Sequence, residues 1–342
     1  MIVRLEAFLR RMGRLARPEE WIARFQGMAA PAATGLEPGL VLIQIDGLGH
    51  AQFERALARG HLPCLARLIR REAYVAHRHY AGLPSSTPAV QATLFYGVRT
   101  AVPAFSYRDQ ASGRIFNMFL PGCASAVEGR LRRQGGRPLL EGGSAYGDIY
   151  TGGAAEPHFC AAAVGWGSLL RPLRNPFGLA LAALLYLPIL ARMAVLGTLE
   201  LGLALYDGVR ALGSGRFFRE LAYLPLRVAV CVQLREAIAA GARVDTVRGL
   251  PVIHVNFAGY DEQAHHRGPR SRFAHWTLRG IDRAIEGIWR AAQRSRRRDY
   301  DIFIYSDHGQ ESTTPYAEVA GCSIAEAVNR VFREQIVSAR WR

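Results

Sequence analysis

Residues 254–269 read HVNFAGYDEQAHHRGP and join an apolar run to a cluster of acidic and histidine side chains. The apolar run starts at Leu250 and continues to Phe257. Asp261 and His265 follow it, four residues apart. A β-rich run that ends in such a pair is how a parallel sheet places ligands at the carboxyl edge of its strands.

Two other segments have the same form. Residues 40–49 read LVLIQIDGLG and carry Asp46, and residues 301–310 read DIFIYSDHGQ and carry Asp307 and His308. Each segment alone has a plainer explanation, since an Asp after a strand is commonly a turn residue and an Asp–His pair is commonly a surface pair on a helix. Carboxylate and imidazole together suit a borderline-soft dication such as Zn²⁺. Their joint occurrence at three strand ends predicts one polynuclear metal site.

Residues 83–97, LPSSTPAVQATLFYG, predict a loop followed by the start of a helix. Proline is favoured at the first helical position, so Pro88 places Thr87 at the expected N-cap. The hydroxyl of Thr87 would then lie in the positive field of a helix N-terminus. Taken alone, this threonine is explained by capping.

Strands and helices alternate along the chain, which predicts an α/β fold with a mainly parallel central sheet and helices on both faces. The expected strands are Gly39–Ile45, 74–80, 250–257 and 302–305, and the expected helices are 51–59, 62–71, 217–243, 271–294 and 324–336. Residues 98–168 are expected to be rich in loops, and their repeated glycines suggest tight turns.

The charge of the chain is strongly positive. All 43 basic residues are arginine and the formal net charge is +15. The absence of lysine excludes Schiff-base lysine chemistry and a P-loop lysine. The charge favours phosphate-rich partners such as anionic lipid headgroups or a phosphorylated substrate, beside the alternative of a compositional habit of the genome. Aromatic and basic residues do not interleave in a recognisable motif, so no specific nucleic-acid binding is predicted.

Cysteine usage and the amino-terminal sequence bear on the compartment. The 5 cysteines are scattered, and we expect them to be reduced. Arginines interrupt every apolar run before residue 28, so no signal peptide is predicted.

The segments together resemble the alkaline phosphatase superfamily, and most closely its type I phosphodiesterase/nucleotide pyrophosphatase branch. Residues 84–97 resemble the segment P-S-x-T-x-P-N-H of that branch and place Thr87 on the nucleophile, although residues 88–91 (PAVQ) stand where the branch has x-P-N-H. YDEQAHHRGP resembles the D-x-x-x-H-x-x-G-P element, and YSDHGQ resembles D-H-G. The resemblance covers about 39–168 and 249–311.

The resemblance implies a site for two divalent metal ions, with zinc expected and manganese or magnesium as alternatives. Asp46, Thr87, Asp307 and His308 would hold one ion, and Asp261 and His265 would hold the other. The implied reaction is hydrolysis of a phosphoric ester, as a phosphodiesterase or phosphatase, through a phosphothreonine intermediate. A metal-bound threonine hydroxyl loses its proton near neutral pH and becomes a strong nucleophile. The implied substrate is a phosphate-ester small molecule or a lipid headgroup.

Two positions concern substrate and ligands. Arg108 falls near the place where diesterases of the branch hold an Asn against the phosphate; an arginine there favours a dianionic monoester, beside the alternative of a surface arginine. The branch takes a third ligand for its second ion from a histidine downstream of D-H-G, and no histidine follows His308. His254 and His275 are the candidates to replace it. The chain also ends before the last strands usual in this fold, so we expect a truncated gene product or an incomplete second site.

We expect four parts in the chain. They are a basic amphipathic arm and linker at 1–38, the first part of the catalytic α/β domain at 39–168, a hydrophobic helical insertion at 169–248, and the second, truncated part of the catalytic domain at 249–342. The insertion resembles that of bacterial members of the branch, which often carry membrane helices. Its apolar runs, 177–191 and 193–206, are each shorter than the roughly 18–20 uncharged residues of a membrane span. An interfacial hairpin and a helical insertion packed on the protein both stay open.

Two other functions stay open as well. One is a transferase that moves a phospho-headgroup to an acceptor at a membrane. The other is a membrane-associated or binding protein with a degenerate site, which the missing histidine favours. We expect a membrane-associated location, with the cytoplasm as the alternative, and we make no prediction of the oligomeric state.

Overall fold

The computed structural model describes residues 19, 22–23, 28, 37–99, 102–163, 180, 183–184, 187–211, 223, 225–314 and 316–337. The predicted arm at 1–38 and the apolar residues 177–186 lie almost entirely outside these residues. The chain divides into two compact units, Met1–Gln310 and Glu311–Arg342, which are described separately.

A parallel sheet forms the centre of the first unit. Among the described residues it has five strands in the order β5–β4–β6–β1–β7, and every neighbouring pair is parallel. Their bounds are β1 Gly39–Ile45, β4 Ser144–Tyr146, β5 Glu156–His158, β6 Val252–Phe257 and β7 Tyr300–Tyr305. The predicted fold class, a mainly parallel sheet with helices around it, is confirmed. Because β1 lies between β6 and β7, the three strands singled out by their polar ends are direct neighbours.

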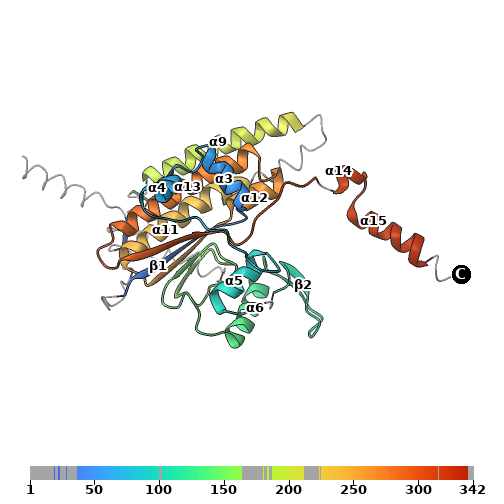
Figure 1. Cartoon of the computed structure of the whole chain (residues 1–342), viewed down its shortest axis with the longest axis horizontal. Coiled ribbons are helices and arrows are strands. Elements are labelled where there is room, and N and C mark those ends of the chain that lie inside the picture. Colours follow the sequence, from blue (N-terminus) through green and yellow to red (C-terminus); the bar gives the residue numbers. More distant parts are fainter. Residues whose placement is uncertain are drawn as a thin grey trace, which may run out of the picture. The chain divides into compact units, whose positions relative to one another are not determined.

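Helices cover both faces of the sheet (Figure 1). One face carries α3 His50–Ala58, α4 Pro63–Arg71, α11 Arg235–Arg248, α12 Gly259–Arg267 and α13 Arg272–Gln293, and the other carries α5 Thr87–Tyr96 and α6 Pro121–Gln134. Side chains alternate along β1, so Val41, Ile43 and Ile45 join the core under α13. The intervening positions face α5, and this alternation carries Gln44 and the following Asp46 to the α5 side of the sheet.

The remaining elements surround this framework. They are the antiparallel pair β2 Ser106–Arg108 and β3 Ile115–Asn117, the 3₁₀ turn Ala161–Ala163, α9 Leu187–Ala211 and the π-helical turn Ala229–Leu234. In the second unit, α14 Tyr316–Ala320 precedes α15 Ile324–Val331 and a π-helical turn, Phe332–Val337. Ser323 and Glu326 form a capping box at the start of α15.

Residues 187–211 of the predicted insertion form one continuous helix, α9. Arg192 does not interrupt α9, because its guanidinium pairs with Glu236 at 3.4 Å. Residues 189–206 of α9 are long and apolar enough to cross a membrane, by length and composition alone. The last part of the predicted insertion is α11, which packs against β6 and supplies Ile238 and Val244 to the core beside the sheet.

Three local expectations were wrong. Residues 74–80, expected as a strand, have no regular structure, because their mainly exposed side chains meet no partner strand. Ser86, and not Thr87, is the N-cap of α5, so Thr87 occupies the first helical position. Helix α6 lies in the region expected to be rich in loops. Its helical pattern was not recognised, because small residues and glycines lie between the buried residues Ala124, Val127 and Leu131.

Candidate metal centre

Asp46 lies in the turn directly after β1 and is 5% exposed. The hydroxyl of Thr87 donates to its Oδ1 at 3.3 Å, and the side-chain amide of Asn256 donates to its Oδ2 at 3.2 Å. Asn256 is on β6, opposite Gln44 of β1, so the sheet register itself brings this amide to the carboxylate. Asp46 is therefore oriented by one donor on each of its two oxygens.

Asp307 and His308 follow β7 and reach the same place. The Nε2 atom of His308 lies 3.4 Å from Oδ1 of Asp46 and 3.7 Å from Oδ2 of Asp307. One oxygen of the fully buried Asp307 accepts from the backbone N–H of Gly47 at 3.4 Å, and its other oxygen is buried without a hydrogen-bond partner in the part of the chain that the structure describes. Ligand atoms of Asp46, Asp307 and His308 lie within 4.8 Å of one another.

Asp261 and His265 lie on α12, the helix that begins directly after β6. Their spacing places them on one face of the helix, where His265 Nε2 and Asp261 Oδ2 are 3.2 Å apart. Two features favour glycine at position 47. A Cβ atom there would collide with the Asp261 carboxylate, and the φ of +72° is one that other residues rarely adopt. Oδ1 of Asp261 also lies 3.9 Å from His308 Nε2, which joins the α12 pair to the other acidic residues.

Burial and mutual repulsion perturb the titration of the cluster. Burial, followed by the charge of Asp307, raises the pKa of Asp46 to about 7. Burial lowers the pKa of His308, but its hydrogen bond to Asp46 and the charges of Asp307, Asp46 and Asp261 outweigh burial and raise it to about 9. The bond to Asp261 raises the pKa of His265. Three carboxylates around one imidazole hold an excess of negative charge that a cation would offset.

A buried hydrogen-bonded network lies beneath the cluster and fixes its support. His254 donates or accepts at both ring nitrogens, with Asp148 Oδ2 at 2.9 Å and the Tyr305 hydroxyl at 2.7 Å. The Tyr305 hydroxyl also donates to Gln44 Oε1 at 3.1 Å, and Gln91 of α5 donates to Asp148 at 2.9 Å. This network links three strands, β1, β6 and β7, to helix α5 next to Asp46 and Thr87.

The two histidines proposed as a third ligand are engaged elsewhere. Both nitrogens of His254 are occupied within the network, so this ring presents no free lone pair to an ion. His275 lies on α13, where its Nδ1 is 2.9 Å from Nδ1 of His61. Asp261 and His265 are thus the only protein ligands that we can assign to the second ion within the described residues.

Arg108 lies in the β2–β3 pair, away from these contacts. Its side chain is exposed, and its Nε donates to the carbonyl of Gly113 in the same hairpin at 3.3 Å. The neighbouring Asp109 pairs with Arg130 at 3.4 Å.

Sequence reasoning did not single out three residues that support the cluster. Asn256 is one of two polar residues, with His254, in the buried strand β6, and a buried amide in a strand is a signal that the sequence offered. Gln91 lies one helical turn after Thr87 on the same face of α5, which was another. Gln310 donates to both the carboxylate and the backbone carbonyl of Asp261, and nothing in the sequence predicts this long-range contact.

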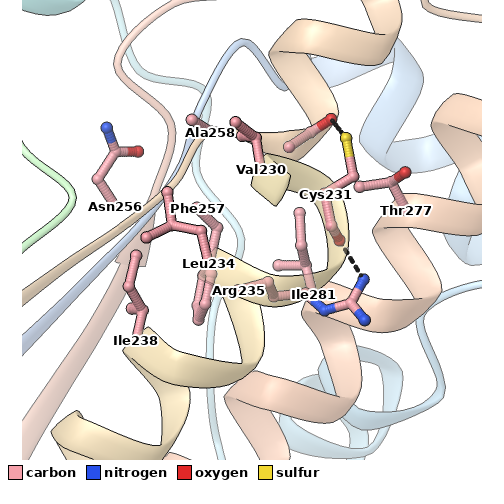
Figure 2. Close-up of a pocket in the computed structure, with 11 residues that line it drawn as sticks. Val230, Cys231, Leu234, Arg235, Ile238, Asn256, Phe257, Ala258, Thr277 and Ile281 are labelled. Carbon is pink, nitrogen blue, oxygen red and sulfur yellow. Dashed lines mark hydrogen bonds between the residues drawn. The ribbon is translucent and has the colours of Figure 1, made fainter. Parts of the chain in front are cut away.

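A concavity lies between the π-helical turn Ala229–Leu234, α11, β6 and α13, and its lining includes Asn256, the residue that donates to Asp46 (Figure 2). Cys231 donates to the carbonyl of Gly259 at 3.4 Å there, and Arg235 donates to the carbonyl of Cys231 at 2.7 Å. Its described lining contains no acidic residue or histidine, and burial raises the pKa of Cys231 to about 12, which keeps that thiol protonated. We therefore place the candidate chemistry at the strand ends.

Comparison with known proteins bears on the family of the chain. A family model described as type I phosphodiesterase / nucleotide pyrophosphatase matches residues 229–340. The matched part contains Asp261, His265, Asp307 and His308, whereas Asp46 and Thr87 precede it. No curated protein matches the chain. The match indicates phosphoester hydrolysis and small phosphoester substrates.

The donor set fits a divalent ion. Carboxylate oxygens and one imidazole converge, and the buried Oδ2 of Asp307 lacks the hydrogen bond that such an atom ordinarily has. Oxygen and nitrogen ligands suit Zn²⁺, Mn²⁺ or Mg²⁺, with the imidazole favouring the first two.

Proposed function

We propose that this protein is a metal-dependent phosphoric ester hydrolase in which Thr87 is the nucleophile. One observation carries the proposal. Thr87 is the first residue of α5 and is 3% exposed, and its hydroxyl donates to Asp46, which lies together with Asp307 and His308. Capping does not explain this position, because the N-cap is Ser86 and the Thr87 hydroxyl is directed to the cluster.

We assign Asp46, Thr87, Asp307 and His308 to one divalent ion, and Asp261 and His265 to a second, with zinc as the expected metal. When bound, such ions supply positive charge that lowers the pKa of a nearby hydroxyl and neutralises phosphate oxygens. The two ligands of the second site leave positions for water or substrate.

The residues of the chain divide the remaining work. Oγ1 of Thr87 attacks phosphorus as the bond from phosphorus to the leaving ester oxygen breaks. The hydroxyl proton passes along the hydrogen bond to Asp46, the leaving oxygen takes up a proton from solvent, and Asp46 then releases its proton to solvent. Asn256 holds Asp46 in the orientation that accepts this bond. The N-terminal end of α5 contributes its positive field, which favours a phosphoryl group on Thr87. Water then hydrolyses the phosphothreonine and restores the hydroxyl.

The test compares Thr87→Ala and Thr87→Ser with wild type on a panel of monoesters and diesters. Thr93→Ala is the matched control, since Thr93 lies on the same helix and donates to its own helix at Ala89. We expect Thr87→Ala to lower kcat by at least about 1000-fold, because the groups of such a site act as a unit. Thr87→Ser should retain measurable turnover and yield a phosphopeptide after an acid quench. Full turnover by Thr87→Ala would overturn the nucleophile assignment.

Two alternatives each have one supporting observation. The exposed apolar side chains of α9, such as Leu187 and Leu199, favour transfer of a phospho-headgroup at a membrane surface. Product that forms only when an acceptor alcohol is added would identify a transferase. The ligand-poor pair Asp261–His265 favours a degenerate site, and failure of the purified protein to bind any divalent metal would identify that case.

We also propose that the described part of 169–248 before α11 is the helical insertion.

A further inference from the structure

A cationic cluster lies between α3 and α13, separate from the metal centre. We call Arg55, Arg59, His61, His275 and Arg279 the arginine–histidine cluster. Arg55 lies in the last turn of α3 and Arg59 is the C-cap of that helix, whereas His275 and Arg279 are one turn apart on α13. The segment that follows α3 meets α13 where Nδ1 of His61 lies 2.9 Å from Nδ1 of His275. Arg55 is six residues beyond Gly49, about 9 Å along the helix axis from the end nearest the metal centre.

The cluster holds polar atoms without partners. His275 is 4% exposed, and its buried Nε2 has no hydrogen-bond partner among the residues that the structure describes. Nη1 of Arg55 is also buried without a hydrogen-bond partner in the described part of the chain. The same holds for the side-chain amide nitrogen and oxygen of Gln52, one turn earlier on α3. Buried polar atoms are ordinarily hydrogen-bonded, so the Nε2 of His275 and the Nη1 of Arg55 can each bond a bound group.

No carboxylate balances the cations. In the described part of the chain, none of Arg55, Arg59 and Arg279 forms an ion pair. The nearest acidic residue on α3, Glu54, pairs instead with His50 at 3.0 Å. Burial lowers the pKa of His275, and the neighbouring His61, Arg59, Arg279 and Arg55 lower it further. Burial and the charges of Arg279 and Arg59 likewise lower the pKa of His61.

The contact between the two rings determines which atom can donate. Both imidazoles are neutral at pH 7, so each keeps a single N–H. When His61 donates from Nδ1, the Nδ1 of His275 accepts and its proton lies on Nε2. The unpartnered Nε2 of His275 is then a buried donor, beside the unpartnered Nη1 donor of Arg55.

We propose that the arginine–histidine cluster binds a phosphate-bearing anion, with the guanidinium groups of Arg55, Arg59 and Arg279 and the Nε2 of His275 as its donors. Arginine forks match phosphate oxygens in paired hydrogen bonds, and a dianion offsets more of the three positive charges than a carboxylate does. Inorganic phosphate, a soluble phosphomonoester and an anionic phospholipid headgroup share this chemistry. The proposal does not rest on the proposed hydrolase function, because none of its residues belongs to the metal centre.

The first experiment uses metal-free full-length protein, so that metal-bound phosphate does not contribute. Inorganic phosphate is titrated against chloride at equal ionic strength, while ring signals of His61 and His275 are followed by NMR. We expect a saturable shift of both signals and a rise in melting temperature. Arg55→Ala and Arg279→Ala should each weaken binding by about tenfold or more, in line with the loss of a charged hydrogen bond.

Matched variants separate binding from folding. Arg70→Ala is the control, since Arg70 is an exposed arginine on the adjacent α4 that donates to the carbonyl of Ala66. Within the described residues the guanidinium groups of Arg55 and Arg279 form no hydrogen bond or ion pair, so their removal should change the melting temperature in chloride little. Arg55→Lys keeps the charge and loses the fork, and an intermediate affinity is expected. Unshifted histidine signals in wild type, an affinity of Arg55→Ala equal to that of wild type, or equal affinity for acetate would overturn the proposal.

A second arm identifies the source of the anion. Wild type and Arg55→Ala are sedimented with vesicles of phosphatidylcholine alone or with phosphatidate added. If wild type binds only the phosphatidate vesicles and Arg55→Ala loses this binding, the anion is a lipid headgroup. If inorganic phosphate binds and both vesicles fail, the anion is soluble. If neither probe gives a response that Arg55→Ala weakens, the proposal is wrong.

Discussion

The hydroxyl of Thr87 and the carboxylate of Asp46 meet at 3.3 Å, although 41 positions of sequence separate them. Asp46 follows the middle of three parallel strands, and Thr87 opens the helix that covers that strand's polar side. Their contact joins a candidate nucleophile to a carboxylate that also approaches His308. Four predictions follow from this geometry and from the contacts around it.

Asp46→Asn should abolish tight metal binding. The substitution keeps the shape of the side chain and its donor from Asn256, but removes a charge from the oxygen nearest His308. We expect the Kd for Zn²⁺ to rise by more than about 100-fold, beyond what changes outside the ligand set cause. Titration calorimetry measures it, with Asp109→Asn in the β2–β3 hairpin as a control. Unchanged zinc affinity in Asp46→Asn would remove Asp46 from the ligand set.

Gln91→Leu should loosen α5 against the sheet. Gln91 donates to Asp148 and accepts from the backbone N–H of Ile149, each at 2.9 Å, so leucine leaves that N–H unpaired and removes one donor from the Asp148 carboxylate, which keeps its bond to His254. We expect a loss of about 1–3 kcal/mol per unpaired group in urea unfolding. If the network positions Thr87, kcat should also fall more than KM changes. Gln110→Leu, at an exposed hairpin position, should change neither quantity; equal effects from both substitutions would contradict the prediction.

Acid should destabilise the protein partly through the His61–His275 pair. The folded-state pKa of each ring lies below its usual value of 6.5, so the unfolded chain takes up protons first as the pH falls. The pair therefore has no effect well above pH 6.5 and reduces stability progressively below it. Melting temperatures from pH 8 to pH 5 in phosphate-free buffer test this. Arg59→Ala should flatten the acid limb, whereas His79→Gln, at an exposed site, should leave it unchanged.

Glu200→Ala should destabilise the packing of α9 against the segment that carries Arg227. The carboxylate of Glu200 and the guanidinium of Arg227 pair at 2.6 Å, with side chains only 3% and 1% exposed. Removing one partner leaves the other charge buried, at a cost of about 3–5 kcal/mol. The double variant Glu200→Leu/Arg227→Met should recover most of this loss. Urea unfolding measures both, and a single variant as stable as wild type would show that the pair is not buried in solution.

Much of the fold could be predicted from local patterns. The strand at Gly39–Ile45 and the helix beginning after Ser271 were confirmed nearly to the residue, because a buried apolar run and a serine N-cap are strong local signals. The strand expected at 74–80 failed because a short local pattern does not supply the neighbouring strand with which a strand must pair. Helix α6 was missed because its apolar stripe is short and interleaved with glycine and arginine.

The sequence by itself determined which groups stand at the strand ends, namely Asp46, Asp261 and the Asp307–His308 pair, because chemistry and strand length are local properties of the chain. Only the tertiary structure decided that β1 lies between β6 and β7, and this order brings those ends together. It also decided that His254 is engaged beneath the cluster and that Asn256 and Gln310 support it. Strand order and side-chain pairing across the sheet arise from the packing of the whole core, which no single stretch of sequence contains.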